Sequence, residues 1–320
     1  MKIRISGLLS VALAALAVTG CRGNGKAEQG FTALPFPEVS IPGMIDSPQE
    51  GAEYMALHYW DVLTDLQRTY PSDSTMASGV RNGDIEQNFV NWIQFLDMTT
   101  LQVGENAVRR LCDRAMACER KDTASTLFEI VVDLSEKYLH DPNSPFRNEE
   151  HYLHFASSLA SYEGFSSEVR DKYAYRARMC SLNRIGTKAS DFRFADRRGR
   201  IRTLYSIEAP KTLLFFSNPG CEACMNIINV LKETPQIAEM VDNGSLAVLN
   251  IYIDEDIQAW RDYMPVYPEQ WYNGFDPDSV LRGNTLYNIR AIPSLYLLDS
   301  DKRVLLKDAP EQVLYQALGL

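Results

Sequence analysis

The chain has 320 residues, of which 45% are hydrophobic and 23% are charged, and its formal net charge at pH 7 is −10. This length favours more than one domain, and the apolar content is enough for a folded core, which excludes wholesale disorder. An acidic chain is a poor ligand for a phosphate backbone, so we expect no nucleic-acid partner. Six cysteines are too few for a disulfide-stapled miniprotein, so each is interpreted from its own surroundings.

Residues 1–20 are predicted to be a lipoprotein signal peptide. Lys2 and Arg4 give a positive start, and residues 7–18 form an apolar run shorter than the about 20 residues that a bilayer span needs. A Val-Thr-Gly sequence stands directly before Cys21 and resembles the lipobox of bacterial lipoproteins, in which cleavage leaves the cysteine lipidated. The alternative is an ordinary signal peptide with an incidental cysteine. We expect Cys21 to carry a lipid anchor outside the cytoplasm.

A flexible tether is predicted over residues 21–46, where Gly, Pro and polar residues mix. An all-α domain of unknown function is predicted over residues 47–183. Its first helix begins at Ser47-Pro48, because Ser47 can cap the helix and Glu50 can complete a capping box. Apolar residues at helical spacing predict further helices from Asp84, around 108–115, over 127–138, and over 149–162 and 166–180. We expect no strand between 47 and 183.

Little in this predicted helical domain points to chemistry. His151 and His154 stand at i, i+3 and could form a metal pair, but two partly exposed helix histidines are the simpler interpretation. We therefore expect no metal. Its aromatic residues favour a core over a ligand cage; they include Tyr54, Tyr59, Trp60, Phe89 and Trp92.

The cysteines of the helical domain are Cys112, Cys118 and Cys180. In one continuous helix Cys112 and Cys118 would lie about 9 Å apart along the helix axis and on different faces of the helix. They therefore cannot form a disulfide with each other. Either could pair with Cys180. Because their number is odd, at least one is free or pairs outside the chain.

A second, α/β domain is predicted over residues 184–320, where strand patterns replace helical ones. A hairpin is expected over 191–204, and short buried strands over 212–216, 246–253 and 294–298. Residues 303–306 are expected to close the sheet as a hairpin strand, and helices are expected over 257–264 and 310–318. The Cys221-Glu222-Ala223-Cys224 sequence opens a helix directly after the strand at 212–216 and the break at Ser-Asn-Pro-Gly.

This second domain resembles the thioredoxin-like fold, specifically the TlpA/ResA-like extracytoplasmic thiol-disulfide oxidoreductases. The resemblance covers about residues 186–320 and is carried by KASDFRFADRRGRIRTL, TLLFFSNPGCEAC and YNIRAIPSLYLLDSDKRVLL. These segments are similar to the family's leading hairpin, its strand–turn–helix, and its succession of proline, strand, acidic turn and strand. The whole chain also resembles Gram-negative lipoproteins that place an uncharacterised helical domain before such a module. This second resemblance does not indicate which activity the helical domain has.

The resemblance implies a role for each residue near the CxxC motif. Cys221 is the expected nucleophile, because backbone N–H groups and the helix dipole stabilise a thiolate at a helix N-terminus. Cys224, one turn further along, is the expected resolving thiol. The proline matching Pro293 is cis in the family and faces the CxxC, so we expect a cis Ile292–Pro293 bond beside Cys221. Glu222 is the expected modulator of the loop, and its charge opposes the thiolate.

Three residues depart from the family pattern. Gly220 stands where an aromatic residue usually precedes the first cysteine, and Ala223 stands where proline is common. Phe215 occupies a position that in some thioredoxins holds a buried acid. The sequence also argues against other uses of the CxxC motif. Met225 follows Cys224 where haem attachment needs histidine. Residues 184–320 contain no second CxxC for a four-cysteine zinc site and no histidine for copper binding or Cys-His catalysis.

The leading hypothesis is a lipid-anchored thiol-disulfide oxidoreductase that reduces protein disulfides through Cys221 and Cys224. The alternative is a partner-binding lipoprotein in which the CxxC disulfide is only structural. The first hypothesis implies a protein disulfide substrate, an electron donor that the sequence does not name, and no cofactor. The expected location is the cell envelope of a Gram-negative bacterium, with a lipid anchor and the protein facing the periplasm.

Overall fold

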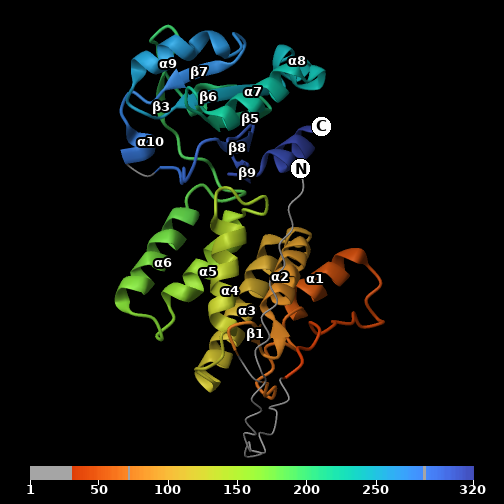
Figure 1. The fold of residues 1–320 in the computed structure, drawn as a ribbon. Helices are drawn as coiled ribbons and strands as arrows, with labels where there is room; N and C mark the ends of the chain where they lie inside the picture. The colour runs from red at the N-terminus through yellow and green to blue at the C-terminus, as the bar shows by residue number, and fades with distance from the viewer. Residues whose placement is uncertain (1–30, 71–72, 284–285) are drawn as a thin grey trace, which may run out of the picture. The chain divides into compact units, whose positions relative to one another are not determined.

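The computed structural model describes residues 31–70, 73–283 and 286–320 (Figure 1). The predicted signal peptide and Cys21 lie outside these ranges, so their interpretation stays a prediction. Residues Ala33–Leu320 form one compact unit. Within the described ranges, none of the helices has both the length and the apolar character needed to span a bilayer.

The first part of this unit is helical. Its helices are α1 (Pro48–His58), α2 (Asn82–Asp97), α3 (Leu101–Lys121), α4 (Leu127–Ser135), α5 (Glu149–Ala160) and α6 (Ser167–Cys180). A π-helical turn over Glu136–His140 continues α4. Ser47 caps α1 as predicted, because its Oγ accepts the N–H of Glu50 at 3.1 Å.

The helices enclose an apolar core built from one face of each helix. Ile85, Phe89 and Trp92 of α2 are 0% exposed, as their spacing predicts. The indole N–H of Trp92 donates to the Ala56 carbonyl at 2.8 Å, which ties α2 to α1. Tyr59, Trp60 and the other predicted core aromatics are buried, except for Tyr54, which is partly exposed.

A short hairpin corrects the expectation that no strand lies between 47 and 183. β1 (Met76–Ala77) pairs antiparallel with β2 (Val80–Arg81). Ser78 and Gly79 join them with φ values of 49° and 75°, the backbone conformation that two-residue hairpin turns require. The strands are too short for an apolar alternation to be visible in the sequence.

The two histidines of α5 are buried, which corrects the expectation that they are partly exposed. His151 and His154 are 5% and 4% exposed. α5 is enclosed because it packs against both α3 and α6. His151 Nε2 lies 3.2 Å from Asp97, and His154 Nδ1 lies 3.8 Å from Glu105. The residues that the structure describes contain no group of three or more His, Cys, Asp or Glu arranged to hold a metal ion.

The expectation that Cys180 could pair with another cysteine of the helical part is wrong. Cys112, Cys118 and Cys180 are all free thiols, and the prediction that Cys112 and Cys118 do not bridge is confirmed. Cys112 and Cys180 both belong to the buried helical core. Cys180 also ends α6, with its Sγ 4.0 Å from the Asn288 amide nitrogen of the α/β part.

The second part of the unit is an α/β fold with a seven-stranded mixed sheet in the described ranges. The strand order is β4-β3-β7-β6-β5-β8-β9. The strands are β3 (Arg193–Asp196), β4 (Ile201–Thr203), β5 (Lys211–Phe216), β6 (Leu246–Tyr252), β7 (Tyr272–Phe275), β8 (Ser294–Asp299) and β9 (Val304–Lys307). β5, β6 and β7 are parallel, while β8 runs antiparallel to β5 and to β9. The helical region followed by this sheet confirms the predicted fold class.

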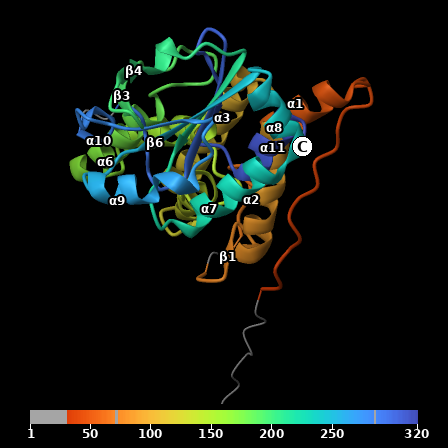
Figure 2. The ribbon, with the colours of Figure 1, turned by 90° about the horizontal axis from the view of Figure 1, so that it is seen from above.

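Helices cover the sheet and explain why its central strands are apolar on both faces. They are α7 (Glu222–Glu233), α8 (Pro235–Asp242), α9 (Ile257–Tyr263), α10 (Val280–Gly283) and α11 (Glu311–Leu318). Leu213 and Phe215 of β5 pack in one cluster with α7, α8 and α11, which lie near one another in Figure 2. Leu214 and Phe216 face the other side, in a cluster that includes Leu281 of α10. A strand that is buried on both faces has a continuous apolar sequence, and β5 shows this pattern.

Candidate functional site: the CxxC turn

The CxxC motif stands where the central strand β5 gives way to α7. A turn connects them, in which the N–H of Cys221 donates to the Asn218 carbonyl at 3.3 Å. Cys221 is the N-cap of α7, and its Sγ accepts the N–H of Cys224 at 3.1 Å. The first turn of a helix has unpaired N–H groups and a partial positive charge. The chain therefore places the sulfur of Cys221 where a thiolate is stabilised.

Cys221 and Cys224 form a disulfide with their Cα atoms 5.2 Å apart. Cys221 is partly exposed, whereas Cys224 is 1% exposed and packs with Ile227 and Ile228 on the apolar side of α7. Only the first sulfur is therefore open to a large partner. This asymmetry matches the nucleophile and resolving positions that the sequence predicts.

The Ile292–Pro293 peptide bond is cis, which confirms the prediction for this bond. Cys221 Sγ lies 3.9 Å from the Ile292 carbonyl oxygen, so the loop before β8 lies beside the first cysteine as expected. Pro293 itself is partly exposed. A partner that reaches Cys221 therefore meets the backbone of this loop.

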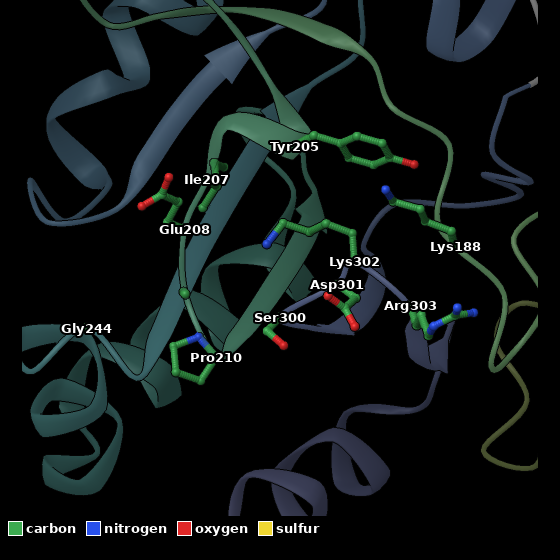
Figure 3. Close-up of a pocket in the computed structure, with 11 residues that line it drawn as sticks. Lys188, Tyr205, Ile207, Glu208, Pro210, Gly244, Ser300, Asp301, Lys302 and Arg303 are labelled. Carbon is green, nitrogen blue, oxygen red and sulfur yellow. The ribbon is translucent and has the colours of Figure 1, made fainter.

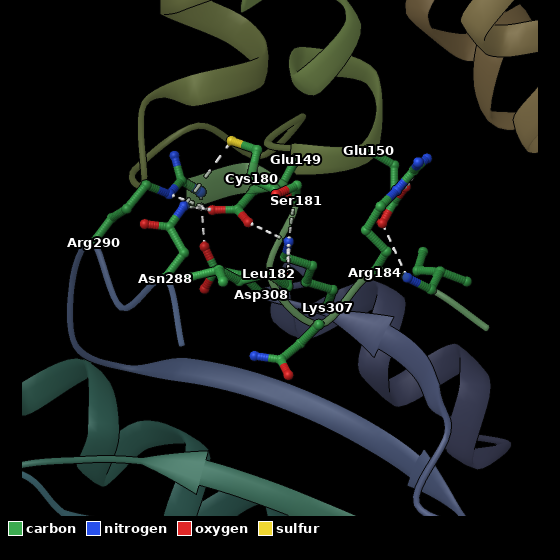
Figure 4. Close-up of polar contacts among 12 residues, drawn as sticks. Glu149, Glu150, Cys180, Ser181, Leu182, Arg184, Asn288, Arg290, Lys307 and Asp308 are labelled. Carbon is green, nitrogen blue, oxygen red and sulfur yellow. Dashed lines mark hydrogen bonds and ion pairs between the residues drawn. The ribbon is translucent and has the colours of Figure 1, made fainter. Parts of the chain in front are cut away.

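A buried ionic network surrounds Arg290, which begins the loop that leads to Pro293 (Figure 4). Arg290 donates from Nη2 to Asp308 at 2.7 Å, and its Nε forms an ion pair with Glu149 of α5 at 2.9 Å. Lys307 of β9 lies 2.9 Å from the other Glu149 oxygen and donates to the Cys180 carbonyl at 2.5 Å. Four buried charges thus connect the helical part, the proline loop and the last strand of the sheet.

The charges of this network balance one another, two cations against two carboxylates. Burial raises the pKa of Glu149, and the charges of Lys307 and Arg290 oppose that rise. Burial lowers the pKa of Arg290, but Glu149 and Asp308 outweigh it, so the pKa of Arg290 is raised. Removing one member would leave an uncompensated buried charge.

A buried polar cluster lies directly before the CxxC turn. Ser217 follows β5 and is 0% exposed, and its Oγ donates to the Asn250 side chain at 2.5 Å. The hydroxyl of Tyr267 lies 3.4 Å from Ser217 Oγ. Burial raises the pKa of Tyr267, so this phenol stays neutral at physiological pH. Nothing in the sequence pointed to this cluster, because its members lie on separate elements.

The structure accounts for the departures from the family pattern. Gly220 has a φ of 77°, a left-handed conformation that glycine adopts without penalty and an aromatic residue does not. Phe215 is 0% exposed and belongs to the apolar cluster beneath α7, so the turn has no buried acid at this position. Glu222 and Ala223 are exposed in the first turn of α7.

A cavity of about 930 Å³ lies away from the CxxC turn (Figure 3). It is lined by residues such as Lys188, Tyr205 and Lys302, and no cysteine is among the described residues that line it. Lys302 donates to Thr212 at 3.2 Å, near the start of β5, whereas Cys221 follows the end of that strand. The cavity and the disulfide therefore belong to opposite ends of β5.

The sheet, the CxxC helix and the cis proline together define a thioredoxin-like fold. A solved thioredoxin-like protein from Bacteroides caccae matches with 33% identity and a TM-score of 0.76, covering 90% of this chain and 99% of that chain. The C-terminal domain of an uncharacterized protein from Bacteroides fragilis matches with 44% identity and a TM-score of 0.42, covering 43% of this chain and 99% of that domain.

The remaining comparisons concern a third solved structure, curated proteins and family models. The thioredoxin domain of a thiol-disulfide oxidoreductase from Bacteroides vulgatus matches with 18% identity and a TM-score of 0.38, covering 42% of this chain and 96% of that domain. A comparison with curated proteins gave no match. Residues 18–183 match the family described as Domain of unknown function (DUF5106). The chain belongs to this family, and a thioredoxin-like domain with a CxxC disulfide follows the matched region.

Proposed function

We propose that the protein is a thiol-disulfide oxidoreductase that reduces disulfides of other proteins. The observation that supports this most is the unequal placement of the two cysteines: Cys221 caps α7 and is partly exposed, while Cys224 is 1% exposed. Such an arrangement activates one thiol and protects the other. A disulfide that served only to brace the fold would need neither the helix start nor the open sulfur.

The reaction begins with the reduced pair. The Cys221 thiolate attacks one sulfur of the substrate disulfide, forming a mixed disulfide and releasing one substrate thiolate, which takes up a proton. The Cys224 thiolate then attacks Cys221 Sγ, which forms the intramolecular disulfide and releases the second substrate thiolate. The substrate gains two electrons and two protons. An external dithiol donor must reduce the Cys221–Cys224 bond before the next cycle.

The direction of the reaction follows from the charge beside Cys221. The N-terminus of α7 favours a thiolate, and the carboxylate of Glu222 in the same turn opposes it. A less stabilised thiolate means a less stabilised reduced form, and hence a more reducing couple. We expect this pair to donate electrons to its substrates.

The proposed location is the cell envelope of a Gram-negative bacterium, with the protein anchored by a lipid and facing the periplasm. The lipobox-like sequence before Cys21 supports a lipid anchor at this residue. A Cys21→Ser variant should lose labelling by a radioactive fatty acid and leave the membrane fraction. Unchanged labelling of that variant would contradict the anchor.

Trapping tests the proposed function. In the Cys224→Ser variant the mixed disulfide at Cys221 cannot be resolved, so disulfide-linked partners should accumulate and be released by reductant. The Cys221→Ser variant is the matched control and should trap none through the CxxC motif, because Cys224 is 1% exposed. The partly exposed thiol of Cys118 is present in both variants and therefore sets the same background. Equal trapping by both variants, or by neither, would contradict the proposed roles.

A further inference from the structure

A groove starts at the CxxC turn, and the helical part of the chain supplies one of its walls. A cavity of about 460 Å³ lies between the CxxC turn, the proline loop, α11 and the segment that precedes α5. Its lining includes Ala223, Pro293, Glu311, Gln316, Asn143 and Pro145. Asn143 and Pro145 belong to the region matched by the family of unknown function.

The groove continues past the site along α11. A second cavity of about 410 Å³ shares Pro145, Arg147 and Gln316 with the first and extends to Asp97 and Asn148. The two cavities therefore adjoin along α11, and together they are called the groove. Two adjoining hollows along one helix suit successive side chains of an extended polypeptide segment.

The wall from the helical part is fixed in place. The guanidinium of Arg147 donates to the Asp308 and Ala309 carbonyls at 3.0 and 2.9 Å, immediately before α11. It also donates to the Ser144 carbonyl at 3.4 Å, within the wall itself. A wall held by three such bonds is formed before any partner arrives, which lowers the entropy cost of binding.

The chemistry of the groove defines what fits in it. Pro142, Pro145, Pro293 and Pro310 line the first cavity and offer apolar rings without N–H groups. Val313 of α11 adds apolar surface and is 41% exposed. This composition suits apolar side chains of an extended segment.

The charge of the groove favours a neutral or basic occupant. Carboxylates stand along it: the exposed Glu222 beside Ala223, Glu311 in the first cavity and Asp97 in the second. The cations in the two linings are already engaged: Arg147 binds three carbonyls, and Lys307 is paired with Glu149 at 2.9 Å. A ligand rich in carboxylates, such as glutathione disulfide, would be repelled.

We infer that the segment over residues 142–147 is a substrate-recognition wall, and that the substrate is an extended, neutral-to-basic polypeptide segment that carries the target disulfide. This inference rests on the proposed function of Cys221 and Cys224. It gives the helical part of the chain a role in selecting the substrate, while the thioredoxin-like part performs the exchange.

The test uses the pre-reduced protein, from residue 21 onward, in single turnovers. Cys21→Ser and Cys118→Ser are introduced so that neither Cys21 nor the partly exposed Cys118 reacts with the probes. The probes are two ten-residue peptides with one cysteine capped as a 2-thiopyridyl disulfide, one containing three lysines and the other three glutamates at the same positions. The small probe is uncharged 2,2′-dithiodipyridine. All three release pyridine-2-thione, so the same absorbance, followed over time at known concentrations, gives each second-order rate constant.

Occluding the wall should slow the peptides selectively. In Asn143→Trp the ratio of the lysine-peptide rate constant to the dithiodipyridine rate constant should fall at least tenfold. Asn106→Trp is the matched control, because Asn106 is exposed on α3 outside both cavity linings, and its ratio should equal that of the wild type. Gln316→Trp, on the opposite wall, repeats the test if Asn143→Trp does not fold by circular dichroism.

Charge provides the second readout. The wild type should prefer the lysine peptide at least fivefold, Glu311→Lys should reduce this preference, and 0.5 M salt should reduce it further. Equal rates for both peptides in the wild type, or an unchanged peptide ratio in both tryptophan variants, would overturn the inference. A wild type that releases no pyridine-2-thione from any probe would instead overturn the proposed function.

Discussion

The helical part and the thioredoxin-like part of the chain hold their cysteines in opposite environments. Burial raises the pKa of Cys112 and of Cys180 to about 12 each. Cys221 instead begins a helix, with the N–H of Cys224 directed at its sulfur from 3.1 Å. The same residue type is therefore inert in one part and positioned for exchange in the other. The difference lies first in burial, which desolvates Cys112 and Cys180, whereas Cys221 is partly exposed. It lies second in the helix start, which offers free N–H groups to the sulfur of Cys221.

Thiol labelling gives the largest expected contrast between the two parts. At pH 8 a thiol with a pKa of about 12 is ionised in about one molecule in ten thousand. In the reduced native protein, iodoacetamide should therefore modify Cys112 and Cys180 at least a thousandfold more slowly than Cys221, as followed by peptide mass spectrometry. In 6 M guanidinium the three rates should converge. Rapid labelling of Cys180 in the native protein would break the comparison.

The buried network that joins the two parts gives the next largest effect. Glu149→Gln removes one carboxylate and leaves Arg290 and Lys307 short of a partner, so we expect the free energy of unfolding to fall by about 3–5 kcal/mol. Urea unfolding followed by circular dichroism measures it. The exposed Glu163 provides the control, and Glu163→Gln should change stability by less than about 0.5 kcal/mol. Equal losses in both variants would show that the network contributes nothing specific.

Acid should destabilise the helical part through His140, which is partly buried, and His154, which is buried. Burial first, and then nearby arginines, lower the pKa of His140 and of His154 to about 4 from the ordinary 6.5. The Arg290 guanidinium lies 3.3 Å from His140 Nδ1, a contact that suits a neutral ring. Because the unfolded chain binds these protons more readily, their stabilisation is complete above pH 6.5 and is lost as the pH falls toward 4.

The variant His140→Phe tests this linkage. It removes one proton-binding group, so its unfolding free energy should fall less steeply between pH 7 and pH 4.5 than that of the wild type. Urea unfolding at a series of pH values measures the slope. Parallel slopes for the two proteins would rule out a contribution from His140.

The smallest expected effect concerns the turn before Cys221. A tryptophan at position 220 would restore the family's aromatic residue but would have to adopt the left-handed φ of 77°. A Cβ there meets no atom within 4 Å, so the cost is conformational, about 1–2 kcal/mol in Gly220→Trp. Gly43→Trp, at a position with the same free space and without a left-handed φ, should cost less than about 0.5 kcal/mol in urea unfolding. Equal costs would contradict this explanation.

Local sequence patterns predicted correctly those features that depend only on residues near one another in the chain. The apolar face of α2, the Ser47 cap, and the start of α7 at the CxxC motif each depend on neighbouring residues, and each was predicted. The cis bond before Pro293 was predicted because the family pattern surrounds it. Most predicted helix ends lie within a few residues of the observed ones, but α3 extends well beyond the predicted 108–115 at both ends, and α8 and α10 were not predicted.

Features that depend on distant segments could not be predicted. The Tyr-Asn-Gly-Phe sequence of β7 contains a turn-like Asn-Gly pair, and it is a strand only because β3 and β6 pair with it. Glu149 and Arg290 meet although they belong to different parts of the chain, and each alone resembles a surface charge. The groove wall at Asn143 and Pro145 depends in the same way on α11 lying opposite.

The redox potential of the Cys221–Cys224 pair tests the central claim most directly. The mature protein would be equilibrated with defined ratios of reduced and oxidised dithiothreitol, and the free thiols at both positions would be quantified by mass spectrometry. We predict a couple above about −300 mV and near the about −270 mV of thioredoxin, since Glu222 opposes the thiolate. A value near about −120 mV would contradict the reducing direction. A bond that stays oxidised below about −300 mV would contradict the redox function and would mark the disulfide as structural.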